Sequence, residues 1–212
     1  MRTKIIPILF AFLLFSCGTS TSITGSWKSD DFTPNQQYGK VFIAALTPAT
    51  NVQNSLENNL ASAARERGIE AAVSHQVFTK KFTKDNQPTK EEMLKTVKDQ
   101  NAGAIFTVTL KDQQSETRYV PGTTTYYTPM NYGYYGRFNS YYNTVYPMTY
   151  DPGYYTEDKV YYLESNLYDA ETEELIWSAQ SKTVNPNDVE SFARGYTKAM
   201  IKELINDGVL KE

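Results

Sequence analysis

The sequence is poor in the residues on which catalytic and metal sites usually depend. Its 212 residues include one histidine, His75, and one cysteine, Cys17. A zinc site needs several clustered histidine, cysteine or carboxylate ligands, and a catalytic nucleophile needs a base positioned beside it. His75 is accompanied by neither a G-x-S-x-G elbow nor a glycine-rich phosphate loop. We therefore predict no catalytic residue, no metal and no cofactor, and we expect His75 to be a surface or loop residue.

Two kinds of segment are also missing. The 21 Lys and Arg residues are offset by 24 Asp and Glu residues, the net charge is -3, and no basic run is longer than a dipeptide. A protein that follows a phosphate backbone needs a basic patch, so nucleic acid is not an expected partner. The longest apolar run, residues 5–15, is shorter than the roughly 20 residues that a helix needs to cross a bilayer.

The amino terminus has the pattern of a secretory signal that ends at a cysteine. Arg2 and Lys4 precede the apolar run, and the small residue Ser16 precedes Cys17. The tetrapeptide at residues 14–17, LFSC, resembles the bacterial lipobox, in which the cysteine receives a diacylglycerol and becomes the new amino terminus. The resemblance implies a lipoprotein signal peptide at residues 1–16, fatty acyl chains such as palmitate on Cys17, and attachment to a lipid bilayer.

The alternative to lipidation is an ordinary signal peptide with a chance cysteine, although the sequence offers that cysteine no disulfide partner. Gly18 carries no acidic inner-membrane retention signal. By family resemblance, we therefore expect the outer membrane, facing the periplasm or the cell surface.

Residues 40–212 are predicted to form one α/β domain after a flexible tether at residues 17–39, on which Trp27 docks against the body. Apolar runs at residues 41–46, 69–73 and 104–110 alternate with helical patterns that start at Thr50 and Thr89, each with a capping-box sequence. Strands separated by helices are expected to be parallel. Two further β runs, residues 159–168 and 175–182, are close enough to form an antiparallel hairpin.

A final amphipathic helix is predicted to begin at Asn185 and Pro186, in the cap and first-turn positions. Its inner positions, at helical spacing, are Val189, Phe192, Ala193, Tyr196, Met200 and Leu204. The predicted order is therefore β-α-β-α-β-β-β-α. It corresponds to a two-layer α/β sandwich with a mixed, five-stranded sheet and a long insertion between the third and fourth strands.

The hairpin carries four acidic residues at its turn that could suggest a calcium site. The spaced oxygen ligands and the glycine bend of a calcium loop are missing, so a solvated turn is expected. The four residues are Asp169, Glu171, Glu173 and Glu174.

The strand KVFIA at residues 40–44, the hairpin sequence SNLYDAETEELIWSAQSKT and the closing helix resemble a family of uncharacterised bacterial envelope lipoproteins. The arrangement is similar to the TolB amino-terminal domain and to the CsgG and LpoB lipoproteins. The likeness covers residues 25–118 and 159–208 and implies an envelope module that is not an enzyme.

The tyrosine-rich insertion, residues 119–158, departs from that family pattern. Fourteen of the 17 tyrosines lie between Tyr119 and Tyr162, set among Asn, Ser, Thr and Gly. Tyrosine gives large, stiff contact area, and binding loops favour this composition. We predict a surface for another envelope protein or for a homo-oligomer, with a glycan-stacking surface and a loop without a partner as alternatives. The predicted contact residues are Tyr126, Tyr127, Tyr132, Tyr134, Tyr135, Tyr141, Tyr142, Tyr154 and Tyr155.

Overall fold

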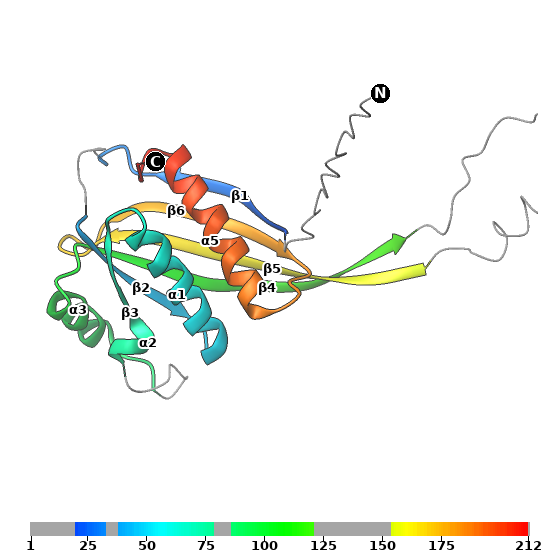
Figure 1. The fold of residues 1–212 in the computed structure, drawn as a ribbon, viewed down its shortest axis with the longest axis horizontal. Helices are drawn as coiled ribbons and strands as arrows, with labels where there is room; N and C mark the ends of the chain where they lie inside the picture. Colours follow the sequence, from blue (N-terminus) through cyan, green and yellow to red (C-terminus); the bar gives the residue numbers. More distant parts are fainter. Residues whose placement is uncertain (1–19, 33–37, 79–85, 121–153, 212) are drawn as a thin grey trace, which may run out of the picture.

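The computed structural model describes residues 20–32, 38–78, 86–120 and 154–211, which form a mixed sheet with helices on both faces (Figure 1). The strands are β1 (Ser20–Lys28), β2 (Lys40–Leu46), β3 (Glu70–Val73), β4 (Ala104–Val120), β5 (Tyr154–Asp169) and β6 (Leu175–Val184). The helices are α1 (Thr50–Arg65), α2 (Ser74–Val77), α3 (Lys90–Asp99) and α5 (Val189–Asn206). The spatial order of the strands is β1-β6-β5-β4-β2-β3.

The predicted strand directions are confirmed. β2 pairs in parallel with both β3 and β4, and the intervening helices make the crossovers that parallel strands require. β5 pairs antiparallel with β4 on one side and with β6 on the other. The mixed α/β class therefore follows from the alternation of strand and helix patterns along the chain.

Within the described residues the sheet has six strands, so the predicted count of five is wrong. Residues 20–28, which the sequence assigned to the flexible tether, form the edge strand β1 and pair antiparallel with β6, from Ser20 opposite Val184 to Lys28 opposite Trp177. The sequence STSITGSWK has no recognisable strand pattern because backbone hydrogen bonds to β6, rather than a run of buried side chains, hold this strand in place. Trp27 lies in this docked strand, opposite Ser178, and 51% of its surface is exposed.

One face of the sheet carries the main core beneath α1 and α5. Trp177 of β6 is completely buried and stacks on Phe106 of β4, with ring centroids 6.4 Å apart. The Trp177 indole donates a hydrogen bond to the Asp207 carboxylate, which follows α5, at 2.7 Å. Of the predicted inner positions of the closing helix, Val189 is only partly buried, and the other five are confirmed as buried: Phe192, Ala193, Tyr196, Met200 and Leu204.

The opposite face is covered at one end, which corrects the expected two-layer arrangement. The alternate side chains of β2 and β4, including Phe42, Ala44 and Ile105, form a second cluster with Val97 of α3. The Phe42 and Phe78 rings meet edge to face, 6.5 Å apart. Each of the two central parallel strands is therefore buried on both faces, as parallel strands usually are.

The local sequence predicts the cap of one helix correctly and those of two others wrongly. Thr89 and Glu92 form the predicted capping box of α3. α1 has no side-chain cap, so the box predicted at Thr50 is wrong. α5 is capped by Asp188 rather than Asn185, because Asn185 instead accepts from the Lys159 backbone N–H at 2.8 Å.

Tyr196 generates a test of the core. It is completely buried, its hydroxyl is hydrogen-bonded to Ser165, and burial raises the pKa of the Tyr196 hydroxyl well above its usual range. The unfolded chain loses this proton near pH 10 while the folded chain keeps it, so stability falls as the pH rises above about 10. Tyr196→Phe should remove up to about 1.4 kcal/mol per pH unit of that decline, measured by urea unfolding from pH 8 to 11.

Tyr155→Phe is the matched control, because the Tyr155 side chain is 75% exposed. It should keep the wild-type decline. An identical slope for Tyr196→Phe and wild type would contradict the role given to this buried hydroxyl.

Candidate functional site

β4 and β5 continue beyond the other strands as a two-stranded extension. We call its outer part, residues 115–120 of β4 and 154–159 of β5, the ribbon. It contains six residue pairs, from Ser115 opposite Lys159 to Val120 opposite Tyr154, and within the described chain no third strand pairs with it. At about 3.4 Å per residue the ribbon is roughly 20 Å long. It projects from the body in Figure 1.

The ribbon replaces part of the predicted loop. Residues 119–158 were expected to lack regular structure, but Tyr119 and Val120 end β4 and Tyr154 begins β5. The ribbon sequences, SETRYV and YYTEDK, show no alternation of apolar and polar residues because neither face of the ribbon is buried, so sequence periodicity could not extend these strands. A register irregularity between Leu110 and Asp112 marks the point at which β4 leaves the covered sheet. Such bulges bend a strand and increase its twist.

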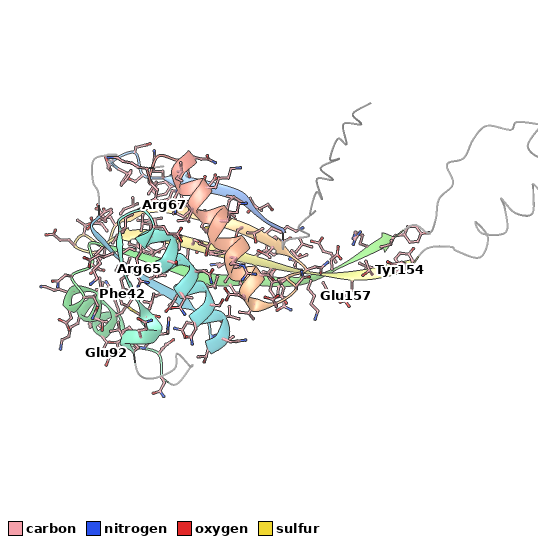
Figure 2. The ribbon with its side chains drawn as sticks, in the orientation of Figure 1. Phe42, Arg65, Arg67, Glu92, Tyr154 and Glu157 are labelled. Atoms are coloured by element: carbon pink, nitrogen blue, oxygen red, sulfur yellow. The ribbon has the colours of Figure 1, made fainter. Side chains whose placement is uncertain are left out.

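Tyrosines lie exposed on both faces of the ribbon. Tyr119 and Tyr155 are directly opposite each other, with ring centroids 5.2 Å apart, and are 49% and 75% exposed. Tyr154, 63% exposed, is next to them on the other face, near the tip in Figure 2. Of the predicted contact residues, Tyr154 and Tyr155 are therefore placed at the surface. The others lie outside the described residues, as does Cys17: Tyr126, Tyr127, Tyr132, Tyr134, Tyr135, Tyr141 and Tyr142.

The base of the ribbon is braced by ionic and polar contacts. Asp158 accepts hydrogen bonds from Asn185 at 2.7 Å and from Arg118 at 2.9 Å, and these bonds lower the pKa of the Asp158 carboxyl. On the neighbouring strand Lys182 pairs with Glu116 at 3.2 Å, which raises the pKa of the lysine. The brace connects β4, β5 and β6 at the point where the ribbon leaves the body.

The ribbon lies at the end of the sheet where the described chain begins. Ser20 is opposite Val184, which is opposite Val160, which is opposite Gln114. The ribbon begins one residue beyond this row. Ser20 is also three residues after the predicted lipid site Cys17. The exposed tyrosines and the entry of the chain into the fold are therefore at one end of the molecule.

A buried carboxylate that sequence reasoning missed lies between α1 and α2. Glu57 has no exposed surface and accepts hydrogen bonds from the backbone N–H of Ala45 at 2.8 Å and of His75 at 2.9 Å. It also accepts from the side chains of Ser74 and Gln53, and His75 Nδ1 lies 2.6 Å from Glu57 Oε2. The carboxylate thereby joins β2, α1 and α2. The expectation that His75 is a surface or loop residue is wrong: it is in α2, with a side chain 15% exposed.

The arrangement of these groups does not fit nucleophilic catalysis. A serine nucleophile hydrogen-bonds to an imidazole and must reach the substrate. The Ser74 hydroxyl is instead completely buried and donates to Glu57 Oε1, while His75 contacts the other carboxylate oxygen. The carboxylate stands between the two groups that would have to exchange a proton, so the cluster is suited to holding the helices in place.

In the acidic turn of the β5–β6 hairpin, the Asp169 carboxylate accepts hydrogen bonds from the backbone of the turn itself. Burial raises the pKa of Asp169, but hydrogen bonds from Thr172, Tyr38 and Glu171 outweigh this effect and leave the pKa below its usual value. The Tyr38 hydroxyl donates to Asp169 at 2.8 Å. Within the part of the chain that the structure describes, no three His, Cys, Asp or Glu side chains are grouped as metal ligands. Within the same residues, no helix has the length and apolar character needed to span a bilayer.

Comparison with solved structures finds several similar chains. PelC from Paraburkholderia phytofirmans, described as a dodecamer, is 16% identical with a TM-score of 0.44, over 87% of this chain and 95% of that chain. Lipoprotein GNA1162 from Neisseria meningitidis is 10% identical with a TM-score of 0.41, over 79% and 98%. A minor lipoprotein from Acinetobacter baumannii is 9% identical with a TM-score of 0.28, over 82% and 96%.

Bacterial lipoproteins are thus among these similar structures. The resemblance to the TolB, CsgG and LpoB type is not confirmed. No protein-family model and no curated protein matches the sequence.

The Glu57 cluster predicts a large effect on stability. Glu57→Gln keeps the shape of the side chain but removes its charge and turns an amide N–H₂ toward groups that themselves donate. Leaving buried donors without an acceptor should reduce the free energy of unfolding by about 3 kcal/mol, measured by urea denaturation at pH 7.

Glu66→Gln is the matched control, because Glu66 is exposed at the C-terminal end of the same helix. It should change stability by less than about 0.5 kcal/mol. If both variants unfold at the wild-type urea concentration, the Glu57 hydrogen bonds do not hold α1 and α2 as described.

Proposed function

We propose that this chain is a lipid-anchored, non-catalytic protein of the bacterial cell envelope whose tyrosine-bearing ribbon contacts another envelope protein or a second copy of the chain. The observation that carries the proposal is the position of the ribbon. Its exposed tyrosines, and strand edges with which no described strand pairs, project from the end of the sheet at which the chain arrives from Cys17.

The geometry supports a partner that is itself held at the membrane. Residues 17–20 can span at most about 11 Å, because an extended chain covers no more than about 3.6 Å per residue. The ribbon extends about 20 Å beyond the row that contains Ser20. An anchor on Cys17 therefore holds the ribbon near the bilayer, where it meets other membrane-attached proteins.

The chemistry of the ribbon suits protein recognition. Each ribbon strand has one edge that no described strand pairs with, and such edges bind other strands through backbone hydrogen bonds. Tyr119, Tyr154 and Tyr155 offer ring surface at low entropic cost, and tyrosine is enriched among residues that dominate binding energy. The brace formed by Arg118 and Asp158 reduces the freedom of the ribbon before it binds.

The position of His75 supports the proposal that the chain is not an enzyme. Its imidazole lies against the buried Glu57 carboxylate, where it stabilises α2. We propose the outer membrane as the location because Gly18, directly after Cys17, carries no acidic inner-membrane retention signal. A mature chain that begins at Cys17 needs its acyl chains to remain attached to that membrane. Two or three such chains make attachment effectively permanent.

The anchor predicts membrane attachment through a single sulfur. Cys17→Ser should move the protein from the membrane pellet to the soluble fraction after cell lysis, because one uncharged hydroxyl replaces the acylated thiol. The wild-type protein and Thr19→Ala, a nearby change that leaves the lipobox intact, should remain in the pellet. Mass spectrometry should find acyl chains on Cys17. A bare Cys17 thiol in membrane-attached protein would contradict the proposed anchor.

The ribbon predicts a position-specific contact in intact cells. A photo-crosslinking amino acid at Tyr154 should give a discrete adduct, whereas the same group at Thr172, in the hairpin turn at the opposite end of the sheet, should not. Mass spectrometry of the adduct distinguishes a second copy from another envelope protein. Attachment to insoluble cell-wall glycan would instead favour the glycan alternative.

The rings can be tested separately from the strands. Tyr119→Ser with Tyr155→Ser should reduce the adduct at least tenfold, since truncating a dominant interface aromatic costs about 2 kcal/mol. Tyr119→Phe with Tyr155→Phe keeps the rings and should retain most of it. Equal yields from position 154 in both double variants would show that these rings do not bind the partner.

A further inference from the structure

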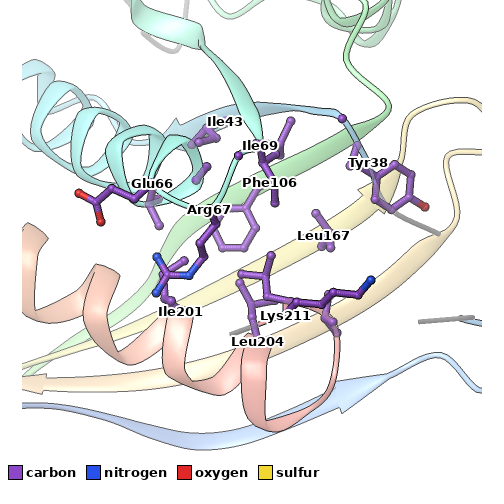
Figure 3. A pocket seen from close by; sticks show the side chains of 18 of the residues that line it. Tyr38, Ile43, Glu66, Arg67, Ile69, Phe106, Leu167, Ile201, Leu204 and Lys211 are labelled. Carbon is purple, nitrogen blue, oxygen red and sulfur yellow. The ribbon is translucent and has the colours of Figure 1, made fainter. Parts of the chain in front are cut away.

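A cavity of about 760 Å³ opens between the C-terminal ends of α1 and α5, above the sheet (Figure 3). Ile43, Phe106 and Leu167 of β2, β4 and β5 line it on the sheet side. Leu60 and Ala64 of α1 line one wall, and α5 lines the other. Its volume falls within the range of about 300–1,000 Å³ that is typical of ligand sites, and such sites combine apolar walls with few polar groups.

The charged side chains of the cavity are at its mouth. They are Glu66, Arg67 and Lys211. In Figure 3 the Arg67 side chain reaches into the opening toward Ile201, and the Glu66 carboxylate points away from it. Among the described residues neither Arg67 nor Lys211 makes an ion pair. The mouth therefore presents positive charge beside an apolar interior.

The C-terminal ends of α1 and α5 partly cancel the positive potential at the mouth. The last carbonyl groups of α1 and α5 carry partial negative charge, which disfavours an anion. Arg67 offsets this charge at α1 by donating to the Ala63 carbonyl at 3.0 Å, and Lys28 does so beyond α5 by donating to the Asp207 carbonyl. Lys211 and the remaining N–H groups of the Arg67 guanidinium are left to face a ligand.

We propose that this cavity binds a single-chain amphiphile, with its apolar tail between α1 and α5 and a carboxylate or phosphate head at Arg67 and Lys211. The tail gains affinity from burial against aliphatic and aromatic walls. The head meets two cations that lack acidic partners among the described residues. The site is at the Lys28 end of β1, whereas the ribbon is at the Ser20 end, so it is separate from the surface proposed to bind a protein.

The experiment uses the chain from residue 17 onward with Cys17→Ser, which keeps every described residue and avoids the lipid anchor. Octanoate, decanoate, dodecanoate, dodecyl phosphate and dodecanol displace a fluorescent dansyl-undecanoic acid probe. Each added methylene should tighten carboxylate binding about fourfold, which corresponds to about 0.8 kcal/mol per buried CH₂. Dodecanoate and dodecyl phosphate should both bind more tightly than dodecanol, and their ratio identifies the preferred head group.

Three variants locate the ligand. Arg67→Gln and Lys211→Gln should each weaken dodecanoate two- to fivefold, the range expected for an exposed ion pair, and leave dodecanol unchanged. Ile201→Trp fills the space between the helices and should weaken every amphiphile at least tenfold. Lys202→Gln is the matched control: it removes one positive charge from α5 outside this cavity and should have no effect. Thermal melting of each variant shows whether it folds.

Affinity that does not depend on tail length would overturn the proposal, as would wild-type affinity in a folded Ile201→Trp variant. Equal weakening by Lys202→Gln and Arg67→Gln would show attraction to overall charge rather than a site. Membrane fractionation and the ribbon crosslink do not involve the cavity, so failure here leaves those results, and the proposed function, unchanged.

Discussion

The pairing of β4 with β5 is the interaction on which the rest of the structure depends. Sixteen residue pairs run from Ala104 opposite Asp169 to Val120 opposite Tyr154, longer than any other pairing in the described sheet. Within the body this pairing is buried, and Phe106, Val108 and Leu163 fix its register by packing beneath the helices. Beyond residue 110 no core covers the β4 side chains, and the same two strands continue into solvent.

A two-stranded ribbon is marginally stable alone in water, so this one depends on the body to which it is joined. The body supplies the register, and the contacts of Asn185 and Lys182 extend support by several residues. The cross-strand ring contact of Tyr119 with Tyr155 adds up to about 1 kcal/mol. The exposed ribbon keeps a defined register because the buried part of the β4–β5 pairing continues directly into it.

Polar groups inside the body position the helices as much as apolar packing does. Glu57 accepts from β2 and from α2, and Tyr196 of α5 is hydrogen-bonded to Ser165 of β5. The bonds of Glu57 with Ala45 and of Tyr196 with Ser165 each tie a helix to a defined point on the sheet, whereas apolar contacts allow small shifts. α1 and α5 run side by side, joined near their N-terminal ends by the Ser55–Glu190 hydrogen bond at 2.6 Å. Their C-terminal ends stand over the cavity, and the ribbon and the cavity lie at opposite ends of the sheet.

Much of the fold was decided by the sequence alone. The apolar runs of β2, β3 and β4 and the helices between them required parallel pairing, and the short turn after Asp169 required a hairpin. Thr89 and Glu92 specified the start of α3, and Gly68, with a positive φ of 76°, follows the end of α1. These features depend on residues close together in the chain, whose periodicity and turn chemistry can be read directly. The resemblance of residues 14–17 to the lipobox likewise predicts lipidation without reference to the fold.

The tertiary structure decided what depends on residues distant in sequence. β1 is a strand because β6 offers it an edge, and β4 and β5 extend past the core because each pairs with the other. Glu57 and His75 are 18 residues apart, and only the packing of α2 against α1 brings them within 2.6 Å. The cavity needs α1, α5 and three strands at once. Which strands pair and which groups surround a buried charge depend on residues that the fold brings together. These contacts cannot be read from the pattern of residues along the chain.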